Sequence, residues 1–272
     1  MTDIVILSAT RSPIGAFQGA FAGVSAPKLG AAAIKGAIAR AGVNPADITD
    51  CLMGNVLQAG IGQAPARQAA LGAGLPQSVR CVTVHKVCGS GLQTVMQAAH
   101  GLAAGAGSLY VAGGMENMTL APYLLPKARD GFRIGHQQVI DSLITDGLWD
   151  PYNNIHMGNC AEQCAAKYKF TREAQDAYAI ESFKRANAAQ KEGKFAAEIT
   201  PFESRGRAGA EPRRHRHRRQ GQHHQGRARR GPGEGEIRQD PDAEARLPEG
   251  RHDHARQRLL HQRRRRRARA CD

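Results

Sequence analysis

The stretch VTVHKVCGSGLQTVMQAAHGL, residues 82–102, changes from the pattern of a strand to the pattern of a helix within a few residues. Residues 82–84 are β-branched, and residues 92–102 carry apolar side chains at helical spacing. Between them, HKVCGSG contains small residues that allow the backbone and a substrate to approach closely. The stretch therefore predicts a strand, a tight turn and a helix, with Cys88 at the turn.

The same alternation continues on both sides of this stretch. Further strands are expected over residues 3–8, 52–57 and 109–112, the last closed by Gly113-Gly114. Helices are expected between Ser25 and Gly42, and over residues 65–71 before Gly72 and Gly74. Strands that alternate with helices indicate an α/β fold with a largely parallel sheet.

The pattern changes after residue 118. Residues 119–150 are interrupted by Pro and Gly, which is typical of irregular structure. Thr171 is then expected to cap a long helix that ends near Gly193. Ala174, Tyr178 and Phe183 are expected on one face of that helix, which we interpret as scaffold.

Charge divides the 272 residues into two parts of different character. Residues 1–212 hold 19 Lys and Arg against 16 acids, whereas residues 213–272 hold 19 Arg, no Lys and 8 acids. This last part has few large apolar residues, so it is expected to be a disordered basic tail. No run of 18 apolar residues and no signal peptide is seen, and the six cysteines show no paired spacing. A reducing compartment, the cytoplasm, is therefore the expected location, without a membrane partner.

The position of Cys88 alone permits two interpretations. It could be a nucleophile, or it could be a buried structural cysteine. The start of a helix generally lowers the pKa of a nearby thiol and favours the reactive thiolate. Cys51 and Cys81 lie at strand starts and are expected in the core. His156, Cys160 and Cys164 could share one helix face, but nothing nearby supplies a fourth ligand, so no metal site is expected.

Several segments together resemble the thiolase family of acyltransferases. These segments are ATRSPIGAFQGAF at 9–21, VCGSGLQTV at 87–95, VAGGMENMT at 111–119, HMGNCAEQCA at 156–165 and the helical stretch at 170–202. The resemblance runs from residue 1 to about 212, roughly the first half of a family member. It implies a thiolase N-terminal half, with an α/β core over residues 1–118 and a partial, CoA-binding loop domain over residues 119–212.

The resemblance also implies chemistry for particular residues. Cys88 matches the nucleophile that takes an acyl group from acyl-CoA, in the reversible condensation of two acetyl-CoA to acetoacetyl-CoA. His156 and Met157 match residues that line the pantetheine arm, and Leu148 matches a position near the CoA adenine. Acyl-CoA thioesters would be substrates, and no metal, nucleotide or redox cofactor is implied. Family members are dimers or tetramers.

Family members complete the site from their second half. That half supplies the His of a Gly-His-Pro motif, the Asn of an Asn-Glu-Ala-Phe segment and the Cys of a Cys-x-Gly-Gly-Gly motif. None of these motifs occurs in the 272 residues. We therefore expect negligible turnover from this chain alone, and apolar surface left exposed, including the helix after Cys88.

The tail at residues 213–272 permits a second interpretation. Arg written in CGN codons becomes Ala, Gly, Asp or Val when read one base later. Read in this way, residues 246–262 and 261–269 resemble the segment that thiolases carry after the loop domain. A one-base shift near Pro212–Arg213 is therefore inferred. Two alternatives are open. The tail could be a basic arm that binds nucleic acid, although it lacks interleaved aromatic residues for base stacking, or the chain could be an inactive CoA-binding relic.

Overall fold

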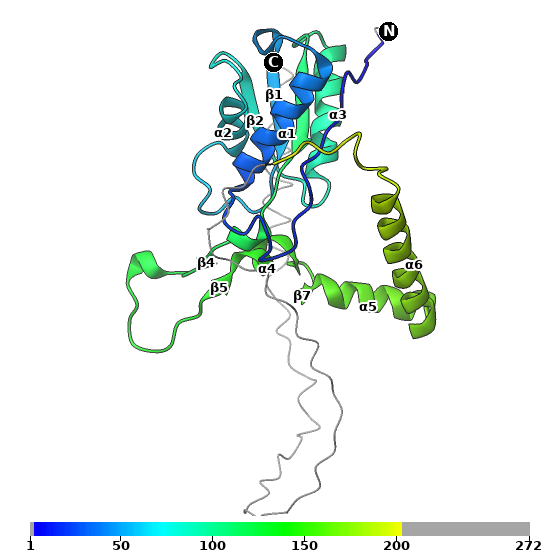
Figure 1. Cartoon of the computed structure of the whole chain (residues 1–272). Coiled ribbons are helices and arrows are strands. Elements are labelled where there is room, and N and C mark those ends of the chain that lie inside the picture. The colour runs from blue at the N-terminus through cyan, green and yellow to red at the C-terminus, as the bar shows by residue number, and fades with distance from the viewer. Residues whose placement is uncertain (1–2, 203–272) are drawn as a thin grey trace, which may run out of the picture. The chain divides into compact units, whose positions relative to one another are not determined.

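The computed structural model describes residues 3–202 (Figure 1). The tail and the inferred frame shift lie outside these residues. The α-helices are α1 Ala26–Ala41, α2 Pro65–Gly72, α3 Ser90–Ala103, α4 Ser142–Gly147, α5 Met157–Tyr168 and α6 Arg172–Lys191. The strands are β1 Asp50–Gly54, β2 Arg80–Val84, β3 Tyr110–Gly114, β4 Tyr123–Leu124, β5 Ile140–Asp141, β6 Trp149–Asp150 and β7 Ile155–His156. Short 3-10 turns occur at Pro45–Asp47, Met118–Leu120 and Ala128–Asp130.

The main sheet has three parallel strands in the order β2-β1-β3, which confirms the α/β prediction. Asp50 pairs with Arg80 on one side and with Tyr110 on the other, so the three strands start and end level. The crossover through α2 leads from β1 to one side, and the crossover through α3 leads back across β1 to the other side. Because such crossovers are right-handed, α2 and α3 cover opposite faces of the sheet.

The core lies between α1, α2 and the sheet. All five residues of β1 are buried, as expected for the central strand of a covered parallel sheet. The small side chains of Ala66, Ala69 and Ala70 allow α2 to lie close to α1. Pro27 near the start of α1 and Gly42 after its end, at φ 66°, give this helix the boundaries that the sequence predicts.

The N-terminal segment is the main error of the sequence prediction. Residues 3–8 are not a strand, because no strand in the described part of the chain pairs with them. Local β propensity forms a strand only where a neighbour supplies hydrogen-bonding partners and packing. The segment is instead attached to α1, where Ser8 Oγ donates to the Ala37 carbonyl at 2.7 Å and Thr10 Oγ1 donates to that of Ala33 at 2.9 Å. Its apolar side chains stay largely exposed, as at Val5 and Ile6.

Two strand boundaries also differ from the prediction. The strand expected over residues 52–57 is β1 and ends at Gly54, since Asn55 turns away to bond the segment after β3. Gly113 and Gly114 lie inside β3 rather than after it. A Cβ at Gly114 would lie 3.3 Å from the Gly91 Cα, so this glycine lets α3 pack closely against the strand.

The segment after residue 118 forms two small antiparallel hairpins and three helices. Strand β4 pairs with β5, and β6 pairs with β7. Thr171 caps α6 as predicted, with its Oγ1 accepting a hydrogen bond from the Ala174 backbone N–H at 3.2 Å. No residue of α6 is buried, however, and Tyr178 and Phe183 are exposed, so the predicted scaffold face is wrong for this structure.

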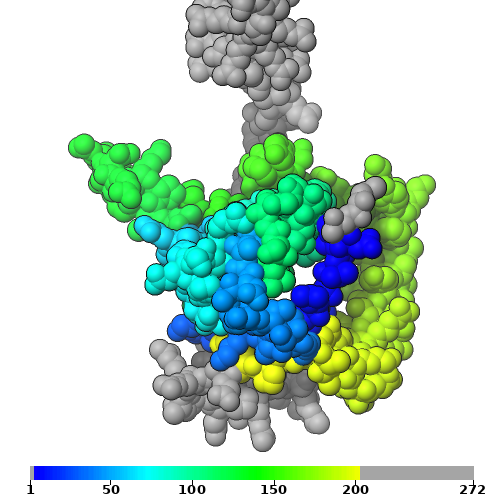
Figure 2. Space-filling view, turned by 90° about the horizontal axis from the view of Figure 1, so that it is seen from above, coloured from blue at the N-terminus to red at the C-terminus, as the bar shows by residue number. Residues whose placement is uncertain are grey.

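After α6 the chain returns to α1. The Arg11 backbone N–H donates to the Glu198 carbonyl at 2.9 Å, and the Thr200 N–H donates to that of Arg11 at 2.8 Å. Gly36 on α1 faces Thr200, and Figure 2 shows the yellow end of the described chain beside the blue α1. The segment that follows α6 is therefore held by the first part of the fold.

Helix α3 leaves apolar side chains uncovered, as the sequence led us to expect. Leu92 is 69 % exposed, and Val95 and Met96 are exposed as well. The opposite side of the helix is buried against the sheet, where Thr94 Oγ1 donates to the Gly113 carbonyl at 2.9 Å. No helix in residues 3–202 has the length and apolar character needed to cross a membrane.

Candidate functional site around Cys88

Cys88 lies where the sheet changes the direction of its crossovers. The chain leaves β1 toward α2 on one face, whereas it leaves the neighbouring β2 through the Cys88 turn toward α3 on the other face. In open α/β sheets, ligands bind at the carboxyl ends of such a pair of strands. The Asn55 backbone N–H donates to the Val84 carbonyl at 3.0 Å and closes the two strand ends against each other.

Glycines of β1 and β3 bring the start of α3 onto this edge of the sheet. A Cβ at Gly54 would lie 2.7 Å from the Gly91 nitrogen and from the Ser90 Cβ, a distance that real Cβ contacts do not reach. A Cβ at Gly114 would lie 3.3 Å from the Gly91 Cα, a tight but less severe contact, whereas a Cβ at Gly91 would make only ordinary contacts. The glycines of β1 and β3 therefore allow the close helix–sheet packing that fixes where α3 begins.

The turn itself is closed by the hydroxyl of Ser90, which is 4 % exposed. Ser90 Oγ accepts a hydrogen bond from the Lys86 backbone N–H at 2.8 Å and donates to the Val87 carbonyl at 2.6 Å. Val87 has φ 46°, an unfavourable conformation for a β-branched residue. Such strain often marks functional sites. Cys88 follows it and is exposed, so the reading as a buried structural cysteine is wrong.

Glu116, just after β3, connects the loop that follows β1 to β3. Its Oε2 accepts hydrogen bonds from the backbone N–H groups of Val56 at 2.8 Å and Leu57 at 3.3 Å. Its Oε1 accepts a third from Asn55 Nδ2 at 2.9 Å, and the same Nδ2 donates to the Met115 carbonyl at 3.2 Å. Asn55 is 1 % exposed, and its Oδ1 accepts no hydrogen bond from residues 3–202.

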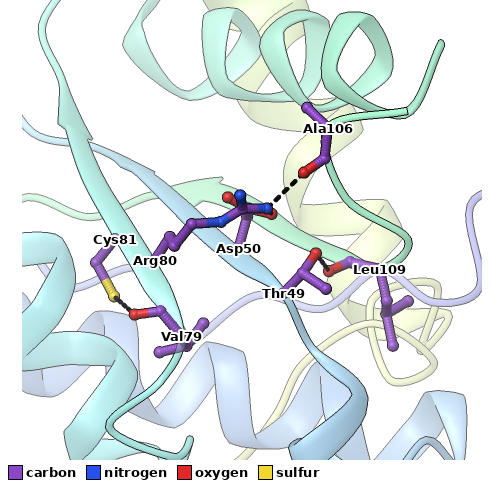
Figure 3. Close-up of polar contacts among 7 residues, drawn as sticks. All are labelled: Thr49, Asp50, Val79, Arg80, Cys81, Ala106 and Leu109. Atoms are coloured by element: carbon purple, nitrogen blue, oxygen red, sulfur yellow. Dashed lines mark hydrogen bonds and ion pairs between the residues drawn. The ribbon is translucent and has the colours of Figure 1, made fainter. Parts of the chain in front are cut away.

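The ion pair of Asp50 and Arg80, with the Ala106 carbonyl, lies at the opposite, amino end of the sheet (Figure 3). We call these three groups the ion-pair cluster. Arg80 Nη2 donates to Asp50 Oδ2 and to the Ala106 carbonyl, both at 2.6 Å. Burial, together with Asp50, raises the pKa of the neighbouring Tyr110. The exposed Cys88 turn has no counterpart of this kind, so the two ends of the sheet differ in chemistry.

Cys51 and Cys81 lie near the amino end of the sheet, as predicted for core positions. Cys51 is fully buried, and burial raises the pKa of its thiol to about 12. Cys81 is half-buried, and burial raises the pKa of its thiol as well. Figure 3 shows the Cys81 sulfur directed toward the Val79 carbonyl, 3.6 Å away. Because a thiol reacts as its thiolate, these two cysteines are poor nucleophile candidates.

The structure brings Leu148, His156 and Met157 together in the hairpin of β6 and β7. The Met157 backbone N–H donates to the Leu148 carbonyl at 2.8 Å. His156 pairs with Trp149 across the hairpin, and their rings meet edge to face at a centroid distance of 6.5 Å. Leu57 connects this region to the sheet edge, because its side chain lies 3.5 Å from where a Cβ on Gly147 would be.

His156 has a structural role in this hairpin. Its Nδ1 accepts a hydrogen bond from the Gly158 backbone N–H at 2.9 Å and caps α5. Cys160 and Cys164 follow on the same helix. Within residues 3–202, no cluster of three His, Cys, Asp or Glu side chains could hold a metal ion.

The sequence prediction did not include Glu116, Asn55, Ser90 or Gly54. A usable signal was present, since Asn55 directly follows the buried strand β1 and Glu116 lies two residues after the half-buried strand β3. At the carboxyl edge of a parallel sheet such residues meet each other, although they are far apart in the sequence. That they meet depends on the strand order β2-β1-β3, which the sequence alone did not establish.

Comparison with known proteins finds a family model and named relatives that match this chain. Residues 4–220 match the model of the thiolase N-terminal domain. The chain is 55 % identical over 201 residues to the acetyl-CoA acetyltransferase of Cupriavidus necator, covering 74 % of this chain and 51 % of that protein. It is 51 % identical over 207 residues to acetyl-CoA acetyltransferase 2 of Arabidopsis thaliana, covering 76 % and 51 % of the two chains.

A third relative, the acetyl-CoA acetyltransferase of Pseudomonas aeruginosa, is 49 % identical over 209 residues, covering 77 % of this chain and 53 % of that protein. The chain thus spans about half the length of the curated relatives it matches. The family match covers most of the 272 residues and includes β1–β3, the Cys88 turn and the β6-β7 hairpin. The chain therefore belongs to the thiolase family, whose N-terminal domain it contains.

Proposed function

We propose that this chain is the nucleophile-bearing part of an acetyl-CoA acetyltransferase, which condenses two acetyl-CoA reversibly to acetoacetyl-CoA and CoA. The observation that carries the proposal is the exposed Cys88, which lies on a strained turn where the crossovers of the sheet change direction. Relatives named acetyl-CoA acetyltransferase, at about half sequence identity, support the choice of acetyl-CoA as the substrate.

Cys88 performs the first half of the reaction. Its sulfur bonds to the carbonyl carbon of acetyl-CoA, the bond between that carbon and the CoA sulfur breaks, and the thiol proton leaves with CoA. In the second half, the α-carbon of another acetyl-CoA loses a proton and bonds to the acyl carbon. The bond to Cys88 then breaks and the sulfur regains a proton.

The hairpin of β6 and β7 is the proposed contact for CoA. Leu148, His156 and Met157 lie together there, and the exposed Met157 offers a flexible apolar surface to the pantetheine arm. Residues that activate Cys88 and hold the thioester oxygen belong, by resemblance, to motifs absent from the 272 residues. We therefore expect acylation of Cys88 without efficient turnover. The cytoplasm remains the proposed location.

The test is transfer of an isotope-labelled acetyl group from acetyl-CoA to the full chain, located by peptide mass spectrometry. We expect label on Cys88, loss of that label in Cys88→Ala, and its retention in Cys164→Ala. Cys164 is the matched control, because it is an exposed cysteine outside the turn. Label on Cys164 at the rate of Cys88, or no label on Cys88, would reject the proposal.

Steady-state cleavage of acetoacetyl-CoA separates acylation from the whole reaction. We expect negligible cleavage by the purified 272-residue chain. A rate equal to that of the full-length relatives, abolished by Cys88→Ala, would show that the missing motifs are not needed.

A further inference from the structure

We propose that Glu116 is a positioning residue that holds the Cys88 turn through the ends of all three strands. The inference rests on the proposed function of Cys88. Glu116 follows β3, its carboxylate bonds the segment after β1, and that segment bonds the end of β2, which leads into the turn. Glu116 does not bond Cys88 itself, so it acts through the backbone between them.

The three contacts of Glu116 require a carboxylate. Asn55 Nδ2 and the backbone N–H groups of Val56 and Leu57 are all donors, so both carboxylate oxygens act only as acceptors. The orientation of the Asn55 side chain is fixed by the same chemistry, because its Nδ2 faces two acceptors. Hydrogen bonds to an ionised acceptor are stronger than neutral ones, which suits a residue that fixes a loop.

Asn55 passes this constraint to the next strand. Its side chain bonds Glu116, and its backbone N–H bonds the Val84 carbonyl at the end of β2. The residue after Val84 begins the HKVC segment, and Ser90 beyond Cys88 packs against Gly54, the residue before Asn55. The turn is therefore fixed on both sides of Cys88 by residues 54 and 55.

Buried Asn55 keeps an unpartnered Oδ1, although both its Nδ2 contacts are made. An unpaired buried acceptor is unfavourable for stability. The ion-pair cluster at the other end of the sheet contains no such atom among residues 3–202.

The chain contains its own reporters for a test. The alkylation rate of the exposed Cys88 depends on the conformation of the turn. The rate of the exposed Cys164 on α5 corrects for the concentration and activity of the reagent, and the buried Cys51 reacts only if the chain unfolds. Iodoacetamide is applied to the full 272-residue chain, and mass spectrometry gives the alkylation rate at each site. The quantity measured is the rate at Cys88 divided by the rate at Cys164.

Glu116→Gln keeps the size of the side chain but turns one acceptor into a donor that faces donors. We expect the ratio to fall about tenfold, because the reagent reaches the Cys88 sulfur in the required geometry only while the turn is held in one conformation. Glu116→Asp keeps the acceptors and should retain more of the ratio than Glu116→Gln. Glu181→Gln removes the same charge on the exposed surface of α6 and should leave the ratio unchanged.

An unchanged ratio in Glu116→Gln with Cys51 still protected would overturn the proposal, as would a larger loss in Glu116→Asp than in Glu116→Gln. If Glu116→Gln unfolds the chain and exposes Cys51, the Asn55→Ala variant is used for the test instead. This variant removes one of the three hydrogen bonds to Glu116. A fall of less than tenfold in the ratio of the Cys88 rate to the Cys164 rate then supports the proposal, and an unchanged ratio overturns it. Absence of acetyl transfer to wild-type Cys88 would reject the proposed function alone, since the alkylation ratio does not depend on CoA.

Discussion

At the amino end of the sheet, Asp50 of β1 and Arg80 of β2 form an ion pair at 2.6 Å. At the carboxyl end, the same two strands lead into Gly54, Asn55 and the Cys88 turn. The charges at the amino end are paired, and its nearby thiols are buried or half-buried. The carboxyl end instead combines the positive φ of Val87, the unpartnered buried Oδ1 of Asn55 and the exposed thiol of Cys88.

This difference shows how one short sheet can separate stability from reactivity. Strained and incompletely bonded groups lower stability, so they persist where the surrounding structure holds them and function requires them. Here the glycines and Ser90 hold the start of α3 against the sheet, and Glu116 holds the loop beside it. Substitutions at the two ends should therefore change different measured quantities.

The largest effect is expected from Gly54→Ala at the carboxyl end. The new Cβ would meet the backbone of Ser90 and Gly91 at 2.7 Å, so α3 must move away from the sheet. We expect a loss of about 1–3 kcal/mol in the free energy of unfolding, measured by urea denaturation, together with a lower alkylation rate at Cys88. Gly23→Ala is the control, because no atom lies within 4 Å of its new Cβ. Equal effects of the two substitutions would contradict the close packing.

The next effect is a pH dependence from Cys51 near the amino end. Burial raises the pKa of its thiol from 9.0 to about 12, so between these values the unfolded chain loses the proton while the folded chain keeps it. The free energy of unfolding should therefore fall as pH rises through this window, by about 1 kcal/mol per pH unit from this group. Cys51→Ala should flatten the slope, whereas Cys164→Ala should leave it unchanged. An unaltered slope in Cys51→Ala would show that the buried thiol does not control it.

A smaller effect is expected from Arg80→Ala. The substitution leaves the buried Asp50 carboxylate without its cation and releases the Ala106 carbonyl, so the free energy of unfolding should fall. The alkylation ratio of Cys88 to Cys164 should not change, because Arg80 lies at the other end of β2. A change in that ratio at constant protection of Cys51 would show that the two ends are not independent.

The smallest change in stability is expected from Val87→Gly. Glycine adopts φ 46° without steric strain, but it also increases the freedom of the unfolded chain, so the net change should stay below about 1 kcal/mol. Relief of the constraint should lower the alkylation rate of Cys88 relative to Cys164. Thermal unfolding and alkylation of the same sample measure both quantities, and a large loss of stability would refute the strain at Val87.

The sequence allowed most of the fold to be predicted where local signals were complete. Helix α1 is set between Ser25 and Gly42, and the Cys88 turn lies between a β-branched segment and a helical one. The strand predicted over residues 3–8 is wrong because a strand needs a neighbouring strand to pair with, and local β propensity does not reveal whether such a neighbour is present. The predicted face of α6 is wrong because Ala174 and Phe183, nine residues apart, lie on opposite sides of an α-helix, and because no residue of α6 is buried.

The candidate site was predicted only in part, for a similar reason. Cys88 has a local signature, and the resemblance to thiolases selected Leu148, His156 and Met157. Glu116 and Asn55 come from different strands and meet only because β1 pairs with β3. Their contact depends on strand order and on a buried amide, which no spacing in one sequence encodes.

The comparison of the two ends is tested most directly by the alkylation rates of Cys51, Cys81 and Cys88 in the wild-type chain. All three lie on β1, on β2 or in the turn that follows β2, and the reagent meets them in one sample. The account predicts rapid modification of Cys88, slower modification of Cys81 and none of Cys51 before unfolding. Modification of Cys51 or Cys81 as fast as Cys88 in the folded chain would contradict the separation of a closed amino end from a reactive carboxyl end.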